Sequence, residues 1–259
     1  MPPLAESVSS KLTPTVRNRI YIAIHTLQSN GVKAAVSHYS ERIIDIVTGK
    51  ERPAERPNIC EERFTARMSD HSLDQLEIRS DNAKWGQLYE PSRADVLHKA
   101  LGKLTERLDN YIFIDLGAGK GLPLLLASEY PFKSIIGVEY SEILADAAEL
   151  NIQRHKEINP SATPIRCVHG DATEFVFPPE PTVVYLFNPF QGKVMDRVIA
   201  NLEASLREHP RDLWVIYVNP WEMRKFRRNP LFETIEWNLD YSIHRYIDRE
   251  PGSLFQQLR

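Results

Sequence analysis

The sequence feature that most constrains the fold is an apolar segment that runs into an aspartate and then into a glycine-rich loop. It reads YIFIDLGAGKGLPLLLASEY, residues 111–130, with glycines at Gly117, Gly119 and Gly121. A short strand, a glycine turn and an apolar helix are typical of an α/β sheet whose first loop approaches a ligand with its backbone. The free N–H groups at the start of the helix favour a carboxylate or a phosphate. The alternative is a glycine turn with a purely structural role.

From about residue 83 onward, strand-like and helix-like segments alternate. The sequence predicts strands over 111–116, 134–139, 164–170, 182–187 and 212–220, and helices over 91–108, 122–130, 141–158 and 194–209. Apolar strands separated by helices predict a parallel sheet covered on both faces. Two further strands, 232–239 and 243–248, are joined by a short link and predict an antiparallel hairpin at one edge. The expected fold class is α/β, with a doubly wound, mostly parallel, seven-stranded sheet over residues 83–259.

Residues 1–82 have a different character. The segment 13–50 has helical spacing, with glycines at Gly31 and Gly49, and the segment 51–82 is polar. We therefore expect a helical extension followed by a connector, separate from the sheet domain. The helices are interpreted as a lid over the site or as a homodimer contact.

The composition excludes several classes of protein. The formal net charge is −3, which gives no strong nucleic-acid signal, and the cations of 223–230 (MRKFRRNP) are interpreted as a solvated helix face. Cys60 and Cys167 lie far apart without CxxC spacing, so we expect no metal site and a reducing compartment. No apolar run is long enough for a membrane helix, and the first residues lack a secretory signal. A cytoplasmic protein with no membrane partner is expected.

The spacing of the glycine loop distinguishes between two classes of ligand. A dinucleotide fingerprint has the spacing G-x-G-x-x-G, whereas this loop has G-x-G-x-G. Asp115, immediately before the loop, would repel the phosphates of a dinucleotide. A carboxylate at this position is favourable beside a cationic amino acid group. The loop therefore favours a ligand that carries an ammonium group.

Polar residues also follow the next two strands. Glu139, followed by Tyr140, is placed to accept hydrogen bonds from both hydroxyls of a ribose. The alternative is a surface glutamate before a helix capped by Ser141. After the third strand, the Asp171 carboxylate and the Ala172 N–H group are suited to reading adenine, and a simple Gly-Asp turn is the alternative.

The fourth strand ends in YLFNPF, residues 185–190. The amide oxygen of Asn188 is placed to accept a hydrogen bond from a nucleophilic nitrogen, while Pro189 fixes the turn and Phe190 supplies an apolar wall. The alternative is an Asn-Pro turn without a chemical role.

These four strand-end segments, DLGAGKG, GVEYS, GDAT and FNPF, in this order resemble the class I S-adenosylmethionine-dependent methyltransferases. The resemblance covers residues from about 83 to the end and implies a Rossmann-like methyltransferase domain. It also implies S-adenosyl-L-methionine as the cofactor. The residues it places around that cofactor are Asp115, Gly117, Ala118, Gly119, Gly121, Glu139, Tyr140, Asp171, Ala172 and Asn188.

Two narrower likenesses concern the segment before the sheet. WGQLYEPSRADVLHKAL, taken with the glycine loop and FNPF, is similar to a bacterial group of largely uncharacterised methyltransferases with an NPF motif. The Y-x-P-S entry also resembles the non-SET lysine methyltransferases. This likeness implies that Tyr89 and Ser92 line the channel for the cofactor or the target nitrogen. The alternative is a helix entry with Ser92 near the cap.

The function expected from these residues is N-methylation of a protein side chain or a small molecule. Asn188, Pro189, Phe190 and Tyr89 form the expected catalytic set. Asn188 would orient the acceptor and not remove a proton, and the candidates for a base are Glu90, His169 and Tyr185. The alternatives are an O- or C-methyltransferase for small molecules and a non-catalytic cofactor-binding module.

Overall fold

The computed structural model describes residues 94–248, apart from 161–162 and 239. The expected helical extension, the connector, the domain boundary at residue 82, and Tyr89, Glu90 and Ser92 all lie outside the described residues.

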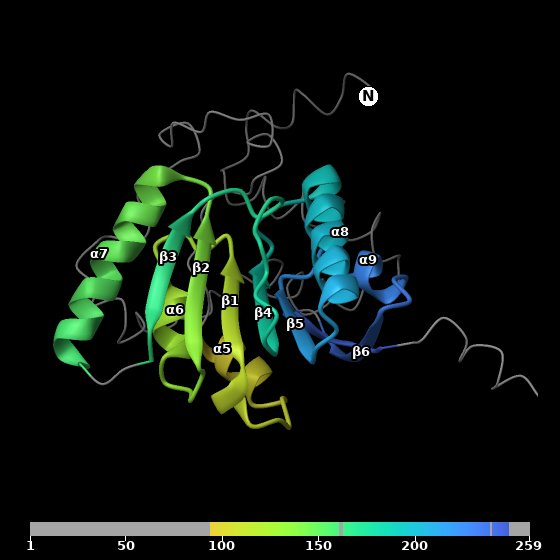
Figure 1. Cartoon of the computed structure of the whole chain (residues 1–259), viewed down its shortest axis with the longest axis horizontal. Coiled ribbons are helices and arrows are strands. Elements are labelled where there is room, and N and C mark those ends of the chain that lie inside the picture. The colour runs from red at the N-terminus through yellow and green to blue at the C-terminus, as the bar shows by residue number, and fades with distance from the viewer. Residues whose placement is uncertain (1–93, 161–162, 239, 249–259) are drawn as a thin grey trace, which may run out of the picture. The chain divides into compact units, whose positions relative to one another are not determined.

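The described residues form an α/β domain around one seven-stranded sheet, with strand order β3-β2-β1-β4-β5-β7-β6 (Figure 1). Strands β1 to β5 run parallel, and β7 runs antiparallel to both β5 and β6. The strand order reverses between β1 and β4, which makes their carboxyl ends the switch point where an open α/β sheet binds its ligand. The strands are β1 Ile112–Leu116, β2 Ser134–Glu139, β3 Ile165–His169, β4 Thr182–Phe187, β5 Leu213–Val218, β6 Phe232–Trp237 and β7 Tyr241–Tyr246.

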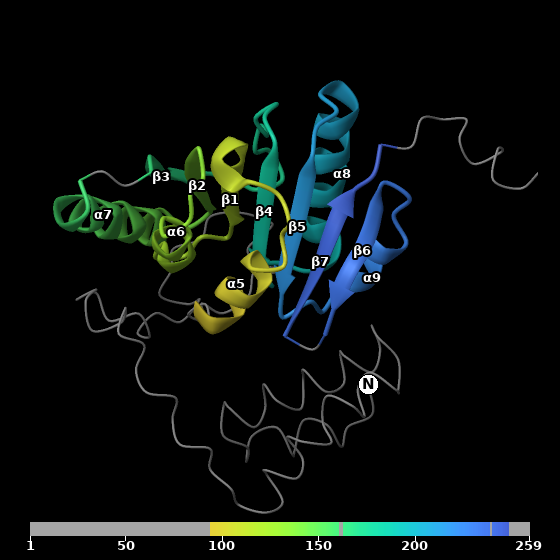
Figure 2. The same cartoon turned by 90° about the horizontal axis from the view of Figure 1, so that it is seen from below.

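Helices cover both faces of the sheet (Figure 2). Alternate residues of each strand point to opposite faces, so Phe113 of β1 packs with one set of helices while Ile112 and Ile114 pack with the other. The first face carries α5 Ala94–Leu101, α6 Leu122–Ala127 and α7 Glu142–Ile158, and the second carries α8 Gly192–Glu208 and α9 Met223–Arg227. A short 3₁₀ helix, η3 Leu108–Asn110, leads into β1.

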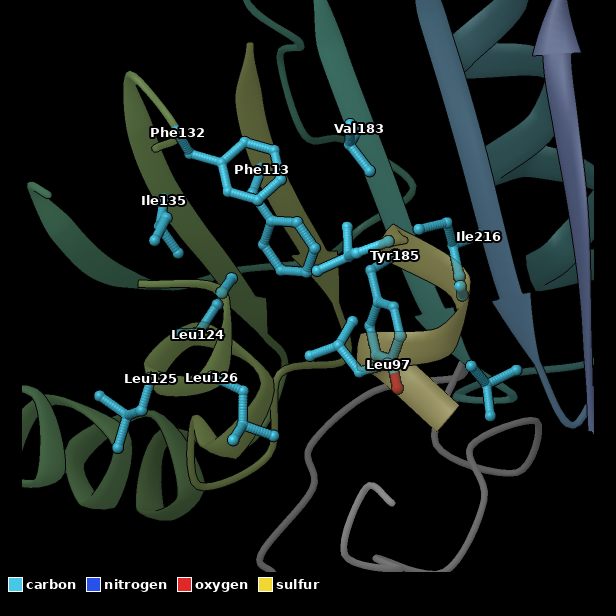
Figure 3. Close-up of a cluster of buried hydrophobic side chains, with 14 of the residues drawn as sticks. Leu97, Phe113, Leu124, Leu125, Leu126, Phe132, Ile135, Val183, Tyr185 and Ile216 are labelled. Carbon is cyan, nitrogen blue, oxygen red and sulfur yellow. The ribbon is translucent and has the colours of Figure 1, made fainter. Parts of the chain in front are cut away.

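The core on the first face is built from strand aromatics and helix leucines (Figure 3). The ring of Phe113 lies 5.3 Å from that of Phe132 and 5.8 Å from that of Tyr185, measured between centroids. Leu97 of α5 and Leu124 of α6 are fully buried against these rings. Each such side chain contributes about 1.5–3 kcal/mol on burial, so this cluster fixes α5 and α6 on the sheet and holds the glycine loop between β1 and α6.

The predicted α/β fold class is confirmed, and all seven predicted strands are present. The largest difference concerns the helix predicted over 91–108, because α5 ends at Leu101. The N–H groups of Lys103 and Leu104 bond to carbonyls three residues earlier, which tightens the chain into turns after Gly102. Helix α6 also ends earlier than predicted, where the Ser128 hydroxyl donates to the Leu125 carbonyl and competes with the helical hydrogen bonds.

Within residues 94–248 as described, no helix is long and apolar enough to span a membrane. The same residues contain no group of three or more His, Cys, Asp or Glu side chains arranged to hold a metal ion.

Candidate cofactor-binding and active site

The loops that follow β1 and β4 meet at the switch point. Gly117 has a φ of +87°, and a Cβ atom added there would lie 2.4 Å from the Cβ atom of Pro189. Two carbon atoms do not approach so closely, so the NPF segment packs directly on the glycine loop only because residue 117 is glycine. The reason for this glycine is therefore the contact with Pro189, in addition to any approach of a ligand.

Gly121 likewise has a packing role. Its φ is +83°, and an added Cβ atom would lie 3.2 Å from the Cβ atom of Ala148 on α7. Ala118 is buried at the same loop, with 3% of its surface exposed. The glycines at 117 and 121 thus fix the loop against two neighbouring elements.

Asp115, the last polar side chain of β1, is buried with 1% of its surface exposed. Among the described residues, neither of its carboxylate oxygens has a hydrogen-bond partner. Burial raises the pKa of Asp115 well above its usual value, and the nearby Glu139 raises it further. A buried carboxylate without partners is costly, so this position is suited to a ligand that brings a cation or a hydrogen-bond donor.

Glu139 connects the end of β2 to the glycine loop. One carboxylate oxygen accepts from the Gly119 N–H group at 2.7 Å and the other accepts from the Ser141 N–H group at 2.9 Å. Burial raises the pKa of Glu139, while these backbone N–H groups act in the opposite direction. Glu139 is only 8% exposed, so it is not the surface glutamate of the alternative interpretation. Ser141 nevertheless caps α7, because its hydroxyl accepts from the Leu144 N–H group at 3.4 Å.

The end of β3 joins the same edge. The Gly170 N–H group donates to the Glu139 carbonyl at 2.9 Å, and the Asp171 Oδ1 atom accepts from the Thr173 N–H group at 2.8 Å. The second bond is the turn chemistry expected as the alternative. Ala172 is buried, at 8% exposed, among side chains of the second core cluster. The adenine role of Asp171 and Ala172 stays a prediction.

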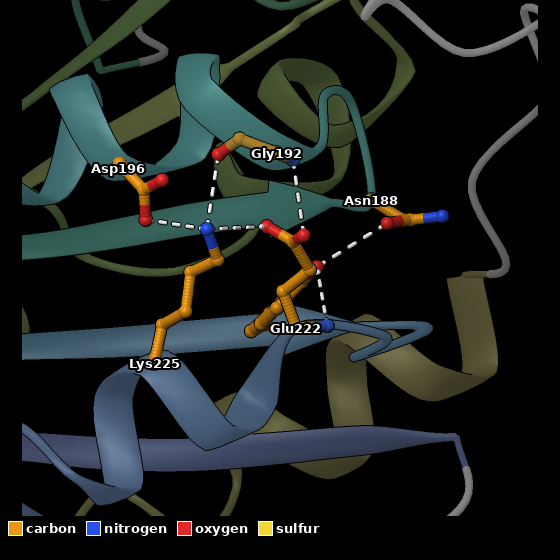
Figure 4. A network of polar contacts seen from close by, with 6 residues as sticks. Asn188, Gly192, Asp196, Glu222 and Lys225 are labelled. Atoms are coloured by element: carbon orange, nitrogen blue, oxygen red, sulfur yellow. Dashed lines mark hydrogen bonds and ion pairs between the residues drawn. The ribbon is translucent and has the colours of Figure 1, made fainter. Parts of the chain in front are cut away.

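Asn188 follows β4 directly and adopts the left-handed conformation, with a φ of +42°. Its side chain is buried, and the Oδ1 atom accepts a hydrogen bond from the Tyr217 hydroxyl at 3.2 Å. The amide nitrogen points away from this contact (Figure 4). Phe190 lies in the core beneath α8, with 7% of its surface exposed, and its wall role stays a prediction.

The Asn188 contact belongs to a larger polar network that connects β5, α8 and α9 (Figure 4). The Tyr217 hydroxyl accepts from the Glu222 N–H group at 3.3 Å, and the Glu222 Oε1 atom accepts from the Gly192 N–H group at 3.0 Å. The Lys225 ammonium donates to the Gly192 carbonyl at 3.0 Å and pairs with Glu222 and Asp196. Lys225, which the sequence assigns to a solvated helix face, is therefore part of a structural network.

Sequence reasoning missed Tyr217, Glu222 and Lys225. A signal is present, because β5 ends in VNPW, residues 218–221, as β4 ends in FNPF, residues 187–190. Phe187 and Val218 are paired at the carboxyl ends of β4 and β5, so the two Asn-Pro segments begin side by side at the same edge of the sheet. Asn219 also has a positive φ, +53°. This repeat predicts that the end of β5 lies beside Asn188.

Two of the three candidates for a general base, His169 and Tyr185, lie within the described residues. His169 is exposed, and its Nε2 atom lies 3.2 Å from the Tyr140 carbonyl oxygen. Tyr185 is fully buried in the first core cluster beside Phe113, so its position fits a packing role.

Comparison with known proteins adds weak likenesses only. No protein-family model and no curated protein matches the chain. Among solved structures, it is similar to an RNA methyltransferase from Salinibacter ruber in complex with S-adenosyl-L-homocysteine, at 19% identity over 63% of this chain and 97% of that one, with a TM-score of 0.44. It is also similar to the 23S rRNA methyltransferase ErmE, at 15% identity over 64% and 74% of the two chains, with a TM-score of 0.45.

A third likeness is to a ribosomal protein L11 methylase from Lactobacillus delbrueckii subsp. bulgaricus. Identity is 14% over 60% of this chain and 77% of that one, with a TM-score of 0.42. At identities and TM-scores this low, the function has to be inferred from the residues of this chain.

Proposed function

We propose that the protein is an S-adenosyl-L-methionine-dependent methyltransferase that acts on a nitrogen of a protein side chain or a small molecule. The observation that carries the proposal is Asp115, a buried carboxylate beside the glycine loop whose oxygens have no hydrogen-bond partner among the described residues. The ammonium group of the cofactor's amino acid part is the partner that this carboxylate requires.

The other loop residues have complementary roles. Glu139 uses one acceptor position on each oxygen for the N–H groups of Gly119 and Ser141, and the remaining positions accept from the ribose hydroxyls. Asp171 and Ala172 face the adenine. When bound, the cofactor supplies a methyl group on a sulfonium, and the chain contributes orientation and exclusion of water.

Asn188 positions the methyl acceptor. Its Oδ1 atom accepts one hydrogen bond from Tyr217 and retains a second acceptor position for the N–H group of a nucleophilic nitrogen. The amide has no useful acid–base range, so it orients the acceptor and takes no proton. The Nδ2 atom, which points away from Tyr217, is a donor that can bond to an acceptor oxygen, so small-molecule O-methylation is the second candidate.

The test uses the full chain and an isosteric variant, Asp115→Asn. Calorimetry should show that the wild-type protein binds S-adenosylmethionine and does not bind NAD. Asp115→Asn should weaken binding of the methyl donor by at least about tenfold, or 1.4 kcal/mol. It should leave the free energy of unfolding unchanged or higher, because the carboxyl group that it replaces is buried without a hydrogen-bond partner among the described residues.

Asp109→Asn is the matched control, because Asp109 is an exposed aspartate in η3 that pairs only with Arg107 among the described residues. Its affinity for the methyl donor should equal that of the wild type. Tight binding of NAD without binding of the methyl donor would overturn the proposal, as would an Asp115→Asn variant that is less stable but binds normally.

A further inference from the structure

The orientation of the Asn188 amide follows from the hydrogen bonds of Tyr217. The Glu222 N–H group can only donate, so the Tyr217 hydroxyl oxygen is its acceptor. The hydroxyl hydrogen of a fully buried tyrosine then needs an acceptor of its own, and Asn188 Oδ1 lies 3.2 Å away. If the amide were reversed, two donors would meet and the buried hydroxyl hydrogen would lose this acceptor. The oxygen of Asn188 therefore faces Tyr217 and the nitrogen faces away from it (Figure 4).

Tyr217 acts as a donor throughout the working range of pH. Burial raises the pKa of its hydroxyl, so the group stays protonated and cannot serve as a base. Its ring is held by Phe226 of α9, with centroids 6.1 Å apart. Tyr217 therefore donates its hydroxyl hydrogen to the Asn188 side chain from one fixed position.

Glu222 and Lys225 hold the segment that supports this contact. The carboxylate of Glu222 accepts from the Gly192 N–H group at the start of α8, where Gln191 provides no side-chain cap. Lys225 joins the Gly192 carbonyl, Glu222 and Asp196. These bonds fix the end of β5 to the segment that follows Asn188, so the two ends of the Tyr217–Asn188 contact keep their separation.

We propose that Tyr217 is a positioning residue, which holds the Asn188 amide in one orientation toward the methyl acceptor, and that the Glu222–Lys225 pair fixes the loops at both ends of this contact. The role of the amide in methyl transfer rests on the proposed function above. The orientation itself can be measured without a known acceptor. An amide held at one end loses less rotational freedom when it meets the substrate, which is the advantage that such a contact gives.

The experiment uses the full chain labelled with ¹⁵N on asparagine side chains, with S-adenosyl-L-homocysteine as the probe. The Asn188 side-chain NH₂ signals are assigned from their loss in Asn188→Asp. In Tyr217→Phe these signals should shift more than those of any other asparagine, because the ring stays and only the hydroxyl is removed. Tyr111→Phe is the matched control, since it removes another hydrogen-bonded hydroxyl, bound to Asp212 at 2.5 Å, at the opposite end of the sheet.

A second pair of variants keeps the proposal testable if Tyr217→Phe fails to fold. Lys225→Met should shift the Asn188 signals in the same direction as Tyr217→Phe, and Lys225→Arg should restore the wild-type spectrum. Unmoved Asn188 signals in Tyr217→Phe or in Lys225→Met would overturn the positioning role.

The two proposals fail in different ways. If Tyr217→Phe gives the expected Asn188 shifts but the wild-type protein binds neither S-adenosylmethionine nor S-adenosylhomocysteine, the proposed function is contradicted and the positioning role is supported. A wild-type protein that binds the probe, with Asn188 signals indifferent to Tyr217→Phe, contradicts only the positioning role.

Discussion

At the scale of single residues, two asparagines occupy backbone conformations that most side chains avoid. Asn188 and Asn219 have φ values of +42° and +53°, each directly before a proline. The left-handed region costs residues with a Cβ atom about 1–2 kcal/mol, and asparagine tolerates it better than most. The Asn188 side chain also accepts a hydrogen bond from the buried Tyr217 hydroxyl.

This contact predicts a pattern in the free energy of unfolding. At both positions, the alanine variant should be less stable than the glycine variant by about 1 kcal/mol, because an alanine Cβ atom is strained in the left-handed conformation. Asn188→Gly should also cost about 1–3 kcal/mol, since it leaves the Tyr217 hydroxyl without an acceptor, whereas Asn219→Gly should be close to neutral. Urea denaturation of the four variants measures both effects. Equal stability of the two glycine variants would show that the Tyr217 contact contributes nothing.

The raised pKa of Asp115 predicts that cofactor binding depends on pH. Below this pKa the carboxyl group of the free protein is protonated, so binding of a cationic ammonium must release a proton. Affinity for S-adenosylmethionine should therefore rise with pH up to the raised pKa and then level off. Calorimetry in buffers of different ionisation enthalpy measures the proton release, and Asp115→Asn should abolish it. Binding of S-adenosylmethionine to the wild type that releases no proton at any pH at which the chain is folded would contradict this linkage.

At the scale of elements, the β1–α6 loop packs against the β4–α8 loop because residue 117, which faces Pro189, is a glycine and has no Cβ atom. Gly117→Ala should destabilise the protein by about 2–4 kcal/mol, because it adds both left-handed strain and a clash with Pro189. Gly121→Ala introduces similar backbone strain, but its added Cβ atom would lie 3.2 Å from the Cβ atom of Ala148 and so clash less. The free energy of unfolding should therefore fall by at least about 1 kcal/mol less than in Gly117→Ala.

Pro189→Gly provides the cross-check for this contact. It removes the Cβ atom that a side chain at position 117 would meet. The two substitutions together should cost less than the sum of their separate effects in denaturation experiments. Simple additivity would mean that the loops do not meet as described.

The antiparallel part of the sheet contains a buried histidine, His244, from which we predict that the free energy of unfolding falls at acid pH. His244 of β7 is stacked on Phe226, with centroids 4.9 Å apart, and its ring nitrogens lie 3.0 Å from Thr234 Oγ1 and 2.9 Å from Ser242 Oγ. Burial lowers the pKa of His244 to about 3, whereas the unfolded value is about 6.5. The unfolded chain thus binds more protons between these values, so stability falls as the pH decreases through this window.

His244→Gln tests this expectation. From pH 6 to pH 4 the wild type should lose up to about 1.4 kcal/mol per pH unit from this group. The variant should lack that component, seen as the difference between the two curves of unfolding free energy against pH. Parallel curves would show that the pKa of His244 is the same in the folded and the unfolded protein, which would contradict this prediction.

At the scale of the whole molecule, the proposed ligand would link the ends of four strands. A compound that binds only the folded chain stabilises it by about 2.7 kcal/mol at a concentration one hundred times its Kd. S-adenosylhomocysteine at this concentration should therefore raise Tm by roughly 5 °C. Adenosine alone, which lacks the ammonium partner of Asp115, should raise Tm less at the same concentration. Equal shifts would remove Asp115 from the site.

Much of the architecture could be predicted from sequence because it depends on local patterns. Apolar runs such as SIIGVE and TVVYLF are too short for helices and lie between periodic segments, and they became β2 and β4 with the expected bounds. The helix predicted through Leu108 failed because its end depends on turns after Gly102 that local periodicity does not report. Glu139 was expected at a strand end, but its burial under the glycine loop required the folded chain.

The sequence by itself determined the alternation of strands and helices, and thereby which polar residues stand at strand ends. Side-chain pattern and turn residues act over a few positions, so they are readable without the fold. Only the tertiary structure decided that Pro189 meets Gly117 and that Tyr217 holds Asn188, because these contacts join residues far apart in sequence. Their distances depend on the sheet order, which places β4 between β1 and β5. Close packing at those strand ends leaves room for one arrangement of the loops, and no local pattern contains that information.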